Sequence, residues 1–443
     1  MRIQLSDHFT YGRLMRFVFP SIVMMIFTSI YGTVDGIFVS NFVGETPFAA
    51  INLTWPVLML MSAFGFMVGS GGNAVVSKAM GEGDYDRANR YFSMLIYATL
   101  IFGTVLAVFG VVFMRRICVM LGAEGDLLDE CITYMSVLVP VIPIFMLQNV
   151  FQSLCITAEK PKFGLYVTVG AGVANMILDA LFIVVFEWGL IGAAIATAMS
   201  QIIGGLVPLI YFSFKNSSRL RLTKAKFEAQ VLIKTCTNGA SELMTNISMS
   251  LVNILYNYKL MEIAGEDGVN AYGIIMYVNF VFVSVFLGYA IGSAPIIGYN
   301  YGAQNRAELQ NMFKKSLILI SATGVFLTVL AEVSADLLAG IFVSNSPALM
   351  EMTAHGFRIY AIAFLIMGFN IFSSAFFTAL GNGLVSAIIS FLRTLVFQVV
   401  PLMILPVFFG LDGVWAAIVV AELIGVIVSF TFFAKLKQRY GYA

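Results

Sequence analysis

The feature that most constrains this chain is a series of twelve apolar runs, each long enough to cross a lipid bilayer as an α-helix. A bilayer core requires about 20 apolar residues per helix. Only 11% of the 443 residues are charged, whereas soluble proteins carry roughly 25%. The sequence therefore predicts an all-α membrane protein with twelve transmembrane helices. The runs cover about residues 14–42, 49–79, 91–114, 131–156, 163–187, 190–214, 230–261, 269–299, 314–336, 353–380, 383–409 and 413–436.

The distribution of positive charge predicts the orientation of these helices. An even number of crossings places both termini on one side, and most of the 25 Lys and Arg residues fall in the loops and helix ends of that side. Cytoplasmic loops carry an excess of Lys and Arg. We therefore expect both termini in the cytoplasm and the chain in the inner (plasma) membrane. The first run is too long for a signal peptide and lacks a small-residue cleavage site, so we expect it to stay as the first helix.

An internal repeat divides the chain into two halves. Gly81 in GEGDYDRANR matches Gly302 in GAQNRAEL, and Thr157 matches Thr378, always with an offset of 221 residues. Duplicated bundles are common in transporters. Since each half has six helices, the halves enter the membrane from the same side, and we expect two six-helix bundles related by a pseudo-twofold axis, with a central cleft. The expected parts are an N-lobe at 1–214, a basic cytoplasmic linker at 215–229 and a C-lobe at 230–443.

Four polar residues stand at depth in the first half. Asp35 lies late in the first run, Asn175 and Asp179 are one helical turn apart in the fifth, and Thr197 lies in the sixth. A carboxylate at the bilayer centre costs about 2.5 to 3.5 kcal/mol on insertion scales, so each one is a candidate site residue. Together these residues offer two carboxylates, an amide and a hydroxyl, which can hold Na⁺ or exchange a proton. The alternative is that Asp179 only bonds a neighbouring helix and that Asp35 lies at the interface.

Further residues are candidates for a hinge and for the cleft. Pro20 removes a backbone hydrogen bond in the first run and is a candidate hinge. Arg393 and Glu422 lie in separate apolar runs, and they either pair with each other or act in function. The residues that we expect to line a substrate cleft are Tyr31, Glu242, Met276, Asn279 and Arg393.

Several classes of function are excluded. A net charge of +1 gives no basic field for nucleic acid, and four scattered cysteines with two histidines cannot form a zinc site. The segment GSGGNAVVSK at 69–78 imitates a phosphate-binding loop, but Ser77 replaces the glycine before Lys78 and Ala79 replaces Ser or Thr. No embedded catalytic motif is present, so we expect neither an ATPase nor another enzyme.

Taken together, these motifs resemble the multidrug and toxic compound extrusion (MATE) family, most closely its bacterial MepA- and DinF-like branch. The resemblance rests on the Pro20-Ser21 pair, VDGIFVSNFVG at 34–44, the loop at 81–90 with its repeat, and NMILD at 175–179. It implies an antiporter that exports cationic or amphipathic drugs in exchange for H⁺ or Na⁺ by rocker-switch movement of two lobes.

The resemblance also implies roles for residues. The cation-coupling set of such members falls on Asp35, Asn175, Asp179 and Thr197, which would also be the place of any bound Na⁺, and the bending proline falls on Pro20. We expect no cofactor, a monomer, and as partners the bilayer and small organic cations or amphipathic drugs. The alternative is a flippase for a lipid-linked or amphipathic metabolite of the same superfamily, although such proteins typically have fourteen helices and a basic cavity.

Overall fold

The computed structural model describes residues 3–342 and 346–443, apart from the side chains of residues 33, 35–37, 40, 41, 45 and 342. Within these residues all regular secondary structure is helical. This agrees with the apolar sequence, because a backbone that crosses hydrocarbon must satisfy its N–H and C=O groups inside its own segment. The chain is an integral membrane protein with the expected all-α fold.

The N-terminal half contains six membrane spans, and two of them are composite. The fourth joins α4 and α5 through a single 3₁₀ turn, η1, and the fifth ends as a π-helix, η2. The elements are α1 (Tyr11–Phe42), α2 (Glu45–Gly81), α3 (Tyr85–Met120), α4 (Gly125–Leu138), η1 (Val139–Val141), α5 (Ile142–Thr157), α6 (Pro161–Asp179), η2 (Ala180–Val185) and α7 (Gly189–Ser213).

In the C-terminal half two helices are each too long for a single crossing. The 74 residues of α8 would span about 111 Å, against roughly 30 Å of hydrocarbon. Each long helix breaks at a glycine with positive φ, Gly265 in α8 and Gly410 in α13, which glycine adopts without strain. The elements are α8 (Ala229–Gly302), α9 (Arg306–Phe342), α10 (Pro347–Ala361), α11 (Phe364–Ala379), α12 (Gly383–Phe391), η3 (Leu392–Val396) and α13 (Phe397–Tyr440).

These two breaks reconcile the observed helices with the expected number of spans. The described chain has nine long apolar helical stretches and one further pair, α10 with α11, bent by 53°. Dividing α8 at Gly265 and the stretch 383–440 at Gly410 gives twelve crossings in the described residues. The prediction of twelve transmembrane helices is confirmed.

Both termini lie at the same end of the bundle, which we call the terminal end. His8 Nδ1 is 2.6 Å from Glu308 Oε2 at the start of α9, and the Tyr442 ring lies 4.9 Å from that of Phe313 on the same helix. The segment 214–228, between α7 and α8, also lies there. Residues 3–10 connect the two halves, because the Leu5 N–H donates to Glu159 Oε1 at 3.0 Å and the Phe9 N–H donates to Glu308 Oε1 at 2.9 Å.

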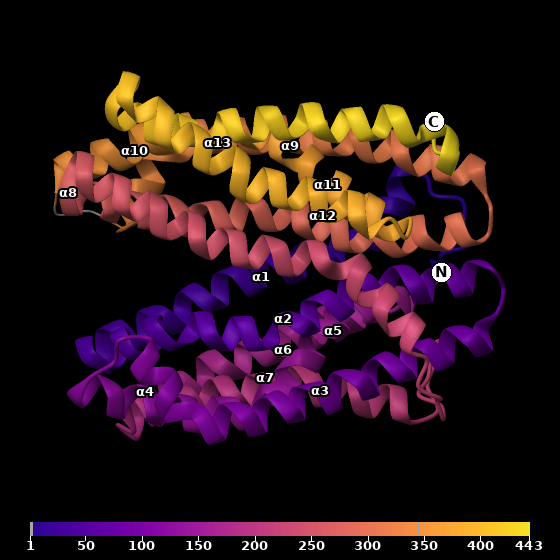
Figure 1. Cartoon of the computed structure of the whole chain (residues 1–443), viewed down its shortest axis with the longest axis horizontal. Helices are drawn as coiled ribbons and strands as arrows, with labels where there is room; N and C mark the ends of the chain where they lie inside the picture. Colours follow the sequence, from indigo (N-terminus) through magenta and orange to yellow (C-terminus); the bar gives the residue numbers. More distant parts are fainter. Residues whose placement is uncertain (1–2, 343–345) are drawn as a thin grey trace.

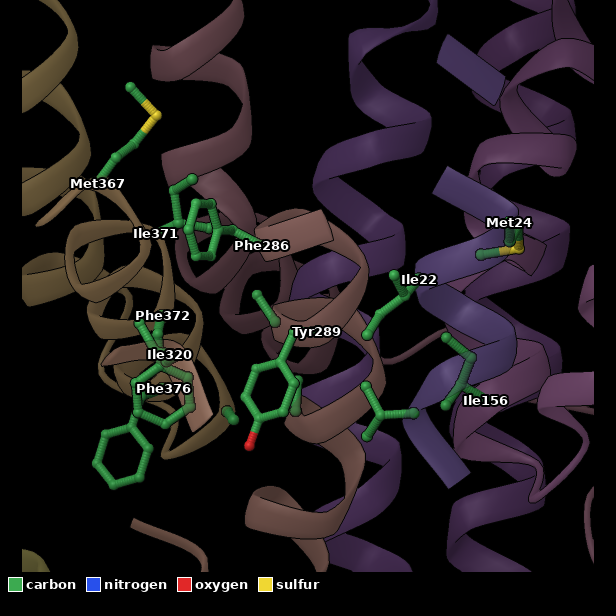
Figure 2. Close-up of a cluster of buried hydrophobic side chains, with 14 of the residues drawn as sticks. Ile22, Met24, Ile156, Phe286, Tyr289, Ile320, Met367, Ile371, Phe372 and Phe376 are labelled. Atoms are coloured by element: carbon green, nitrogen blue, oxygen red, sulfur yellow. The ribbon is translucent and has the colours of Figure 1, made fainter. Parts of the chain in front are cut away.

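Figure 1 shows two helical lobes side by side, which approach each other near the terminal end. One hydrophobic core runs across the boundary between them. Figure 2 shows part of it, with Ile22 and Met24 of α1 and Ile156 of α5 on one side of α8, and Phe372 and Phe376 of α11 on the other. Each half therefore packs internally and against the other half.

Glycines allow close contacts of backbone with backbone between the lobes. A Cβ atom on Gly81 of α2 would overlap the carbonyl oxygen of Tyr299 on α8, and a Cβ on Gly302 would overlap the carbonyl of Lys78. The two contacts are equivalent, because an offset of 221 converts one pair of residues into the other. The internal repeat of the sequence is therefore also a symmetry of the packing, as two lobes related by a pseudo-twofold axis require.

This tight packing belongs to the terminal half of the helices. A Cβ on Gly288 or Gly292 of α8 would clash with Ile22 or Val18 of α1. By contrast, a Cβ on Gly32 of α1 or Gly273 of α8, both farther from the terminal end, would meet no atom within 4 Å. The lobes are therefore held together most closely where the termini lie.

We predict that Gly302→Ala destabilises the protein, whereas Gly273→Ala in the same helix does not. The added methyl group at Gly302 meets rigid backbone at Lys78, and overpacking of this kind costs about 1–3 kcal/mol. At Gly273 alanine gains about 1 kcal/mol of helix propensity. Thermal unfolding of the two purified variants measures the difference, and equal melting temperatures would contradict the packing argument.

Candidate functional site

Three of the predicted coupling residues are buried in the N-lobe. Asn175, Asp179 and Thr197 are 2%, 0% and 8% exposed. Asn175 and Asp179 share one face of α6, since residues one turn apart on a helix lie one above the other, and α6 packs against α7, which carries Thr197. A carboxyl, an amide and a hydroxyl are thus buried on two neighbouring helices of the N-lobe.

A small apolar cluster shows that α1 belongs to the same place. Val39 of α1, Ile183 of η2 and Ala193 of α7 are buried together. Each of them lies one helical turn farther from the terminal end than a predicted site residue, because Val39 follows Asp35 by four residues, Ile183 follows Asp179 by four and Ala193 precedes Thr197 by four. The three polar positions therefore lie at one level, beneath an apolar cap.

On the terminal side of that level, aromatic residues of α1 rest on α6. A Cβ added at Gly172 would meet the Tyr31 ring at 3.0 Å, and the rings of Phe27 and Tyr31 lie 6.1 Å apart. Gly172 precedes Asn175 by three residues and so shares its face of α6. Tyr31, predicted as a cleft residue, thus contacts the helix that carries the coupling residues. The Asp35 side chain lies outside the described residues, although its backbone continues α1 one turn beyond Tyr31.

The backbone also changes character at this level. Helix α6 ends at Asp179, and the chain continues as the π-helix η2. Wider π turns occur frequently at functional sites. The widened turn begins directly after the buried carboxyl, so the geometry there differs from that of an ordinary helix.

Pro20, the predicted hinge, lies inside a continuous α1. It has no N–H to donate to the carbonyl of Arg16, so one bond of the helix is missing there. Its neighbours Val18 and Ile22 form the tight crossing with α8. The missing backbone hydrogen bond of α1 therefore lies where the helix packs against α8 of the other lobe.

The C-lobe buries a different polar group, an ion pair. Arg393 Nε donates to both carboxyl oxygens of Glu422 at 2.9 Å. Asn370 Nδ2 donates to Glu422 Oε2 at 2.7 Å and Ser429 Oγ donates to Asn370 Oδ1 at 2.8 Å. The pairing alternative for Arg393 and Glu422 is the one that the structure shows. Sequence reasoning missed Asn370 and Ser429, and the lone asparagine in the apolar run 353–380 was the available signal.

The two lobes differ in charge at equivalent positions. The offset of 221 relates Glu422 to Gln201 and Asn370 to Asn149, both of which are buried in the N-lobe. Where the C-lobe has the carboxylate of Glu422 and the guanidinium of Arg393, the N-lobe has the uncharged Gln201 and Gly172. The acid buried within a membrane span of the N-lobe, Asp179, lies on another helix, α6.

The remaining predicted cleft residues lie on α8. Glu242 precedes the break at Gly265, and Met276 and Asn279 follow it. Glu242 and Met276 are half-buried and Asn279 is buried. Among the described residues Glu242 has no ion-pair partner. The contacts therefore do not join these three residues into one polar cluster with the N-lobe site.

The fold and the buried site define a membrane transporter built from two repeated lobes. The MatE family model matches residues 20–181 and 243–404, once in each half. The chain belongs to the MatE family.

Relatives and solved structures agree with this assignment. Multidrug export protein MepA of Staphylococcus saprophyticus is 25% identical over 96% of this chain and 94% of its own length, and MepA of Staphylococcus aureus is 24% identical over the same shares. A structure described as a MATE in complex with MaL6 aligns with a TM-score of 0.92 over 97% of both chains at 23% identity. Another, described as the outward-facing conformation of a multidrug resistance MATE family transporter, gives 0.91 over 97% and 96% at 23% identity.

We predict that the buried pair of Arg393 and Glu422 is strongly coupled in stability. Removing one partner leaves an uncompensated buried charge and costs about 3–5 kcal/mol, whereas replacing both is much less harmful. The measurement is a double-mutant cycle of Arg393→Met and Glu422→Leu by thermal unfolding.

The exposed pair of Arg358 and Asp336, at 2.6 Å in the same lobe, is the matched control. Exposed pairs contribute about 0–1 kcal/mol. Additive effects of the two substitutions at the buried pair, similar to those at the exposed pair, would show that the buried pair has no special role.

Proposed function

We propose that this protein is a multidrug efflux antiporter that exports cationic or amphipathic organic compounds in exchange for H⁺ or Na⁺. The observation that carries the proposal is the buried set of Asn175, Asp179 and Thr197 beneath its apolar cap. A carboxyl in low dielectric favours its neutral form unless a cation accompanies it. Such a site therefore takes up a proton or a sodium ion when it faces one solution and releases it to the other.

The orientation of the lobes is part of the proposal. Most of the Lys and Arg residues lie at the terminal end, which we assign to the cytoplasm by the positive-inside rule. Because the lobes pack most tightly there, the arrangement corresponds to a transporter closed on the cytoplasmic side. A solved transporter of the same fold is likewise described as outward-facing. In this proposal the protein acts as a monomer in the plasma membrane.

The mechanism joins the site to the hinge. A cation that binds at Asp179, with Asp35 contributed by α1, changes the charge between α1 and α6. The terminal part of α1 is held against α8 near Val18 and Ile22, whereas the part beyond Pro20 lacks one backbone bond. Cation binding therefore shifts the distal part of α1 and drives the drug from the cleft, and release of the cation inside resets the lobes.

The names of relatives support the drug as substrate, since the staphylococcal relatives are called multidrug export proteins. The ion pair of the C-lobe speaks against a flippase for a pyrophosphate-linked lipid. The Arg393 guanidinium is neutralised by Glu422, and so this arginine is not available to such a headgroup.

We predict that Asp179→Asn abolishes coupled efflux while the protein still folds. The amide keeps the size of the side chain and removes the charge that binds the cation. The measurement is efflux of a fluorescent cationic dye from cells that express each variant at equal membrane levels. Asp129→Asn is the control, because it makes the same chemical change at an exposed carboxyl of the same lobe. Full efflux by the Asp179 variant would remove this site from the mechanism.

We predict that dye efflux by the wild type depends on one gradient only. In proteoliposomes with an imposed Na⁺ gradient or an imposed pH gradient, the gradient of the coupling ion accelerates efflux, and the other does not. A monovalent ion that crosses 100 mV supplies about 2.3 kcal/mol, which is roughly a 50-fold accumulation of a neutral drug. Efflux that is indifferent to both gradients would contradict antiport.

A further inference from the structure

A polar cavity of about 360 Å³ lies between the lobes at the terminal end. Its charged lining comes from both lobes, with α2 and α3 on one side and α8 and α13 on the other. The residues that matter are Lys78, Glu82 and Arg87 of the N-lobe and Lys234, Tyr301 and Arg439 of the C-lobe. The cavity is therefore distinct from the membrane-embedded site of Asp179.

The cavity carries an excess of positive charge. Glu82 is the one carboxylate among its described lining residues, and it pairs with Arg87 and lies 3.8 Å from Lys78. Asp84 lies outside the lining and adds a contact of 3.5 Å to Arg87. Lys234 and Arg439 have no carboxylate within ion-pair distance among the described residues. Four cations thus surround one space with one acid in its wall.

This arrangement attracts an anion, because the exposed Lys234 and Arg439 face the same space as Lys78 and Arg87. Like charges in a partly enclosed space repel each other more strongly than in open water. A phosphate group offers several acceptor oxygens, and Arg binds it through a planar fork while Lys binds it as a point charge. The Lys78 ammonium lies 5.3 Å from the centre of the Tyr301 ring of the C-lobe and 3.8 Å from Glu82 of the N-lobe. These two contacts place it at the boundary between the lobes.

We propose that this cavity binds a phosphate-bearing anion that joins the two lobes at the terminal end. Two of the cations, Lys78 and Arg87, belong to the N-lobe, and two, Lys234 and Arg439, belong to the C-lobe. One phosphate between them is a bridge, which breaks if the lobes separate there. The anion binds and stabilises the arrangement closed at this end.

The phosphate has two possible sources, the headgroup of an anionic lipid in the adjacent leaflet and a free phosphate in solution. Basic pockets between transmembrane helices on the cytoplasmic side bind lipid headgroups. Binding itself does not rest on the proposed antiport. Only its consequence, a slower return to the opposite arrangement, rests on that function.

The test measures binding without transport. The purified full-length protein in phosphatidylcholine nanodiscs is titrated with inorganic phosphate, against sodium chloride of equal ionic strength, and its melting temperature is followed. In a second arm, without inorganic phosphate, the nanodiscs contain phosphatidylglycerol. The variant Lys234→Gln/Arg439→Gln removes two lining cations. The control Lys435→Gln/Lys437→Gln removes two exposed cations from the same end of α13 that do not line the cavity.

We expect a rise in melting temperature for the wild type and the control, and a half-saturating concentration at least about tenfold higher for the cavity variant, since two charge-assisted contacts are lost. A response to inorganic phosphate identifies the free anion as a ligand, and a response only to phosphatidylglycerol identifies the lipid. No response in either arm, or an equal loss in the control variant, overturns the proposal. Because the readout is stability, a failed antiport hypothesis would leave this result intact.

Discussion

The close contact of backbone with backbone between α2 and α8 is the constraint on which the rest of the arrangement depends. Gly81 rests on the carbonyl of Tyr299 and Gly302 rests on that of Lys78. In a membrane, helices gain nothing from hiding apolar surface from water, so association depends on close packing that small residues permit. Because the two contacts are related by the repeat, they hold the lobes as a symmetric pair at one end. The same contact places basic side chains of both lobes around one cavity.

Two copies of one fold have acquired different polar interiors. In the C-lobe the buried acid, Glu422, is neutralised by Arg393 and held by Asn370. In the N-lobe the equivalent of Glu422 is Gln201, and the acid buried within a membrane span, Asp179, lies on another helix, at the level of Asn175 and Thr197. The charge of an acid that is paired with an arginine is already neutralised, so this acid does not need a bound proton or Na⁺. This asymmetry is the reason that we propose the N-lobe, and not the C-lobe, for cation coupling.

Helix α1, which contains Pro20, connects the level of the proposed cation site to the other lobe. The proline lies in α1 between Val18 and Ile22, where the helix crosses α8. Near Pro20, α1 packs against α8 of the other lobe. Beyond Pro20, α1 continues to the level of Asn175, Asp179 and Thr197. In the proposed mechanism, a change of charge at that level acts on the distal part of α1, while the part near α8 stays fixed. Residues 3–10 reinforce the fixed part through Glu159 and Glu308.

The sequence by itself determined the membrane location, the number of spans and the repeat, because apolar run length and a constant offset are properties of the chain alone. It also selected Asn175, Asp179 and Thr197, since buried polar residues are costly in hydrocarbon. Only the tertiary structure decided that Arg393 pairs with Glu422 and that Asn370 and Ser429 join them, because partners 29 to 59 residues apart meet through helix packing. The basic cavity could not be predicted either, since Lys78 and Arg439 lie far apart in the sequence and line one cavity only in the folded chain.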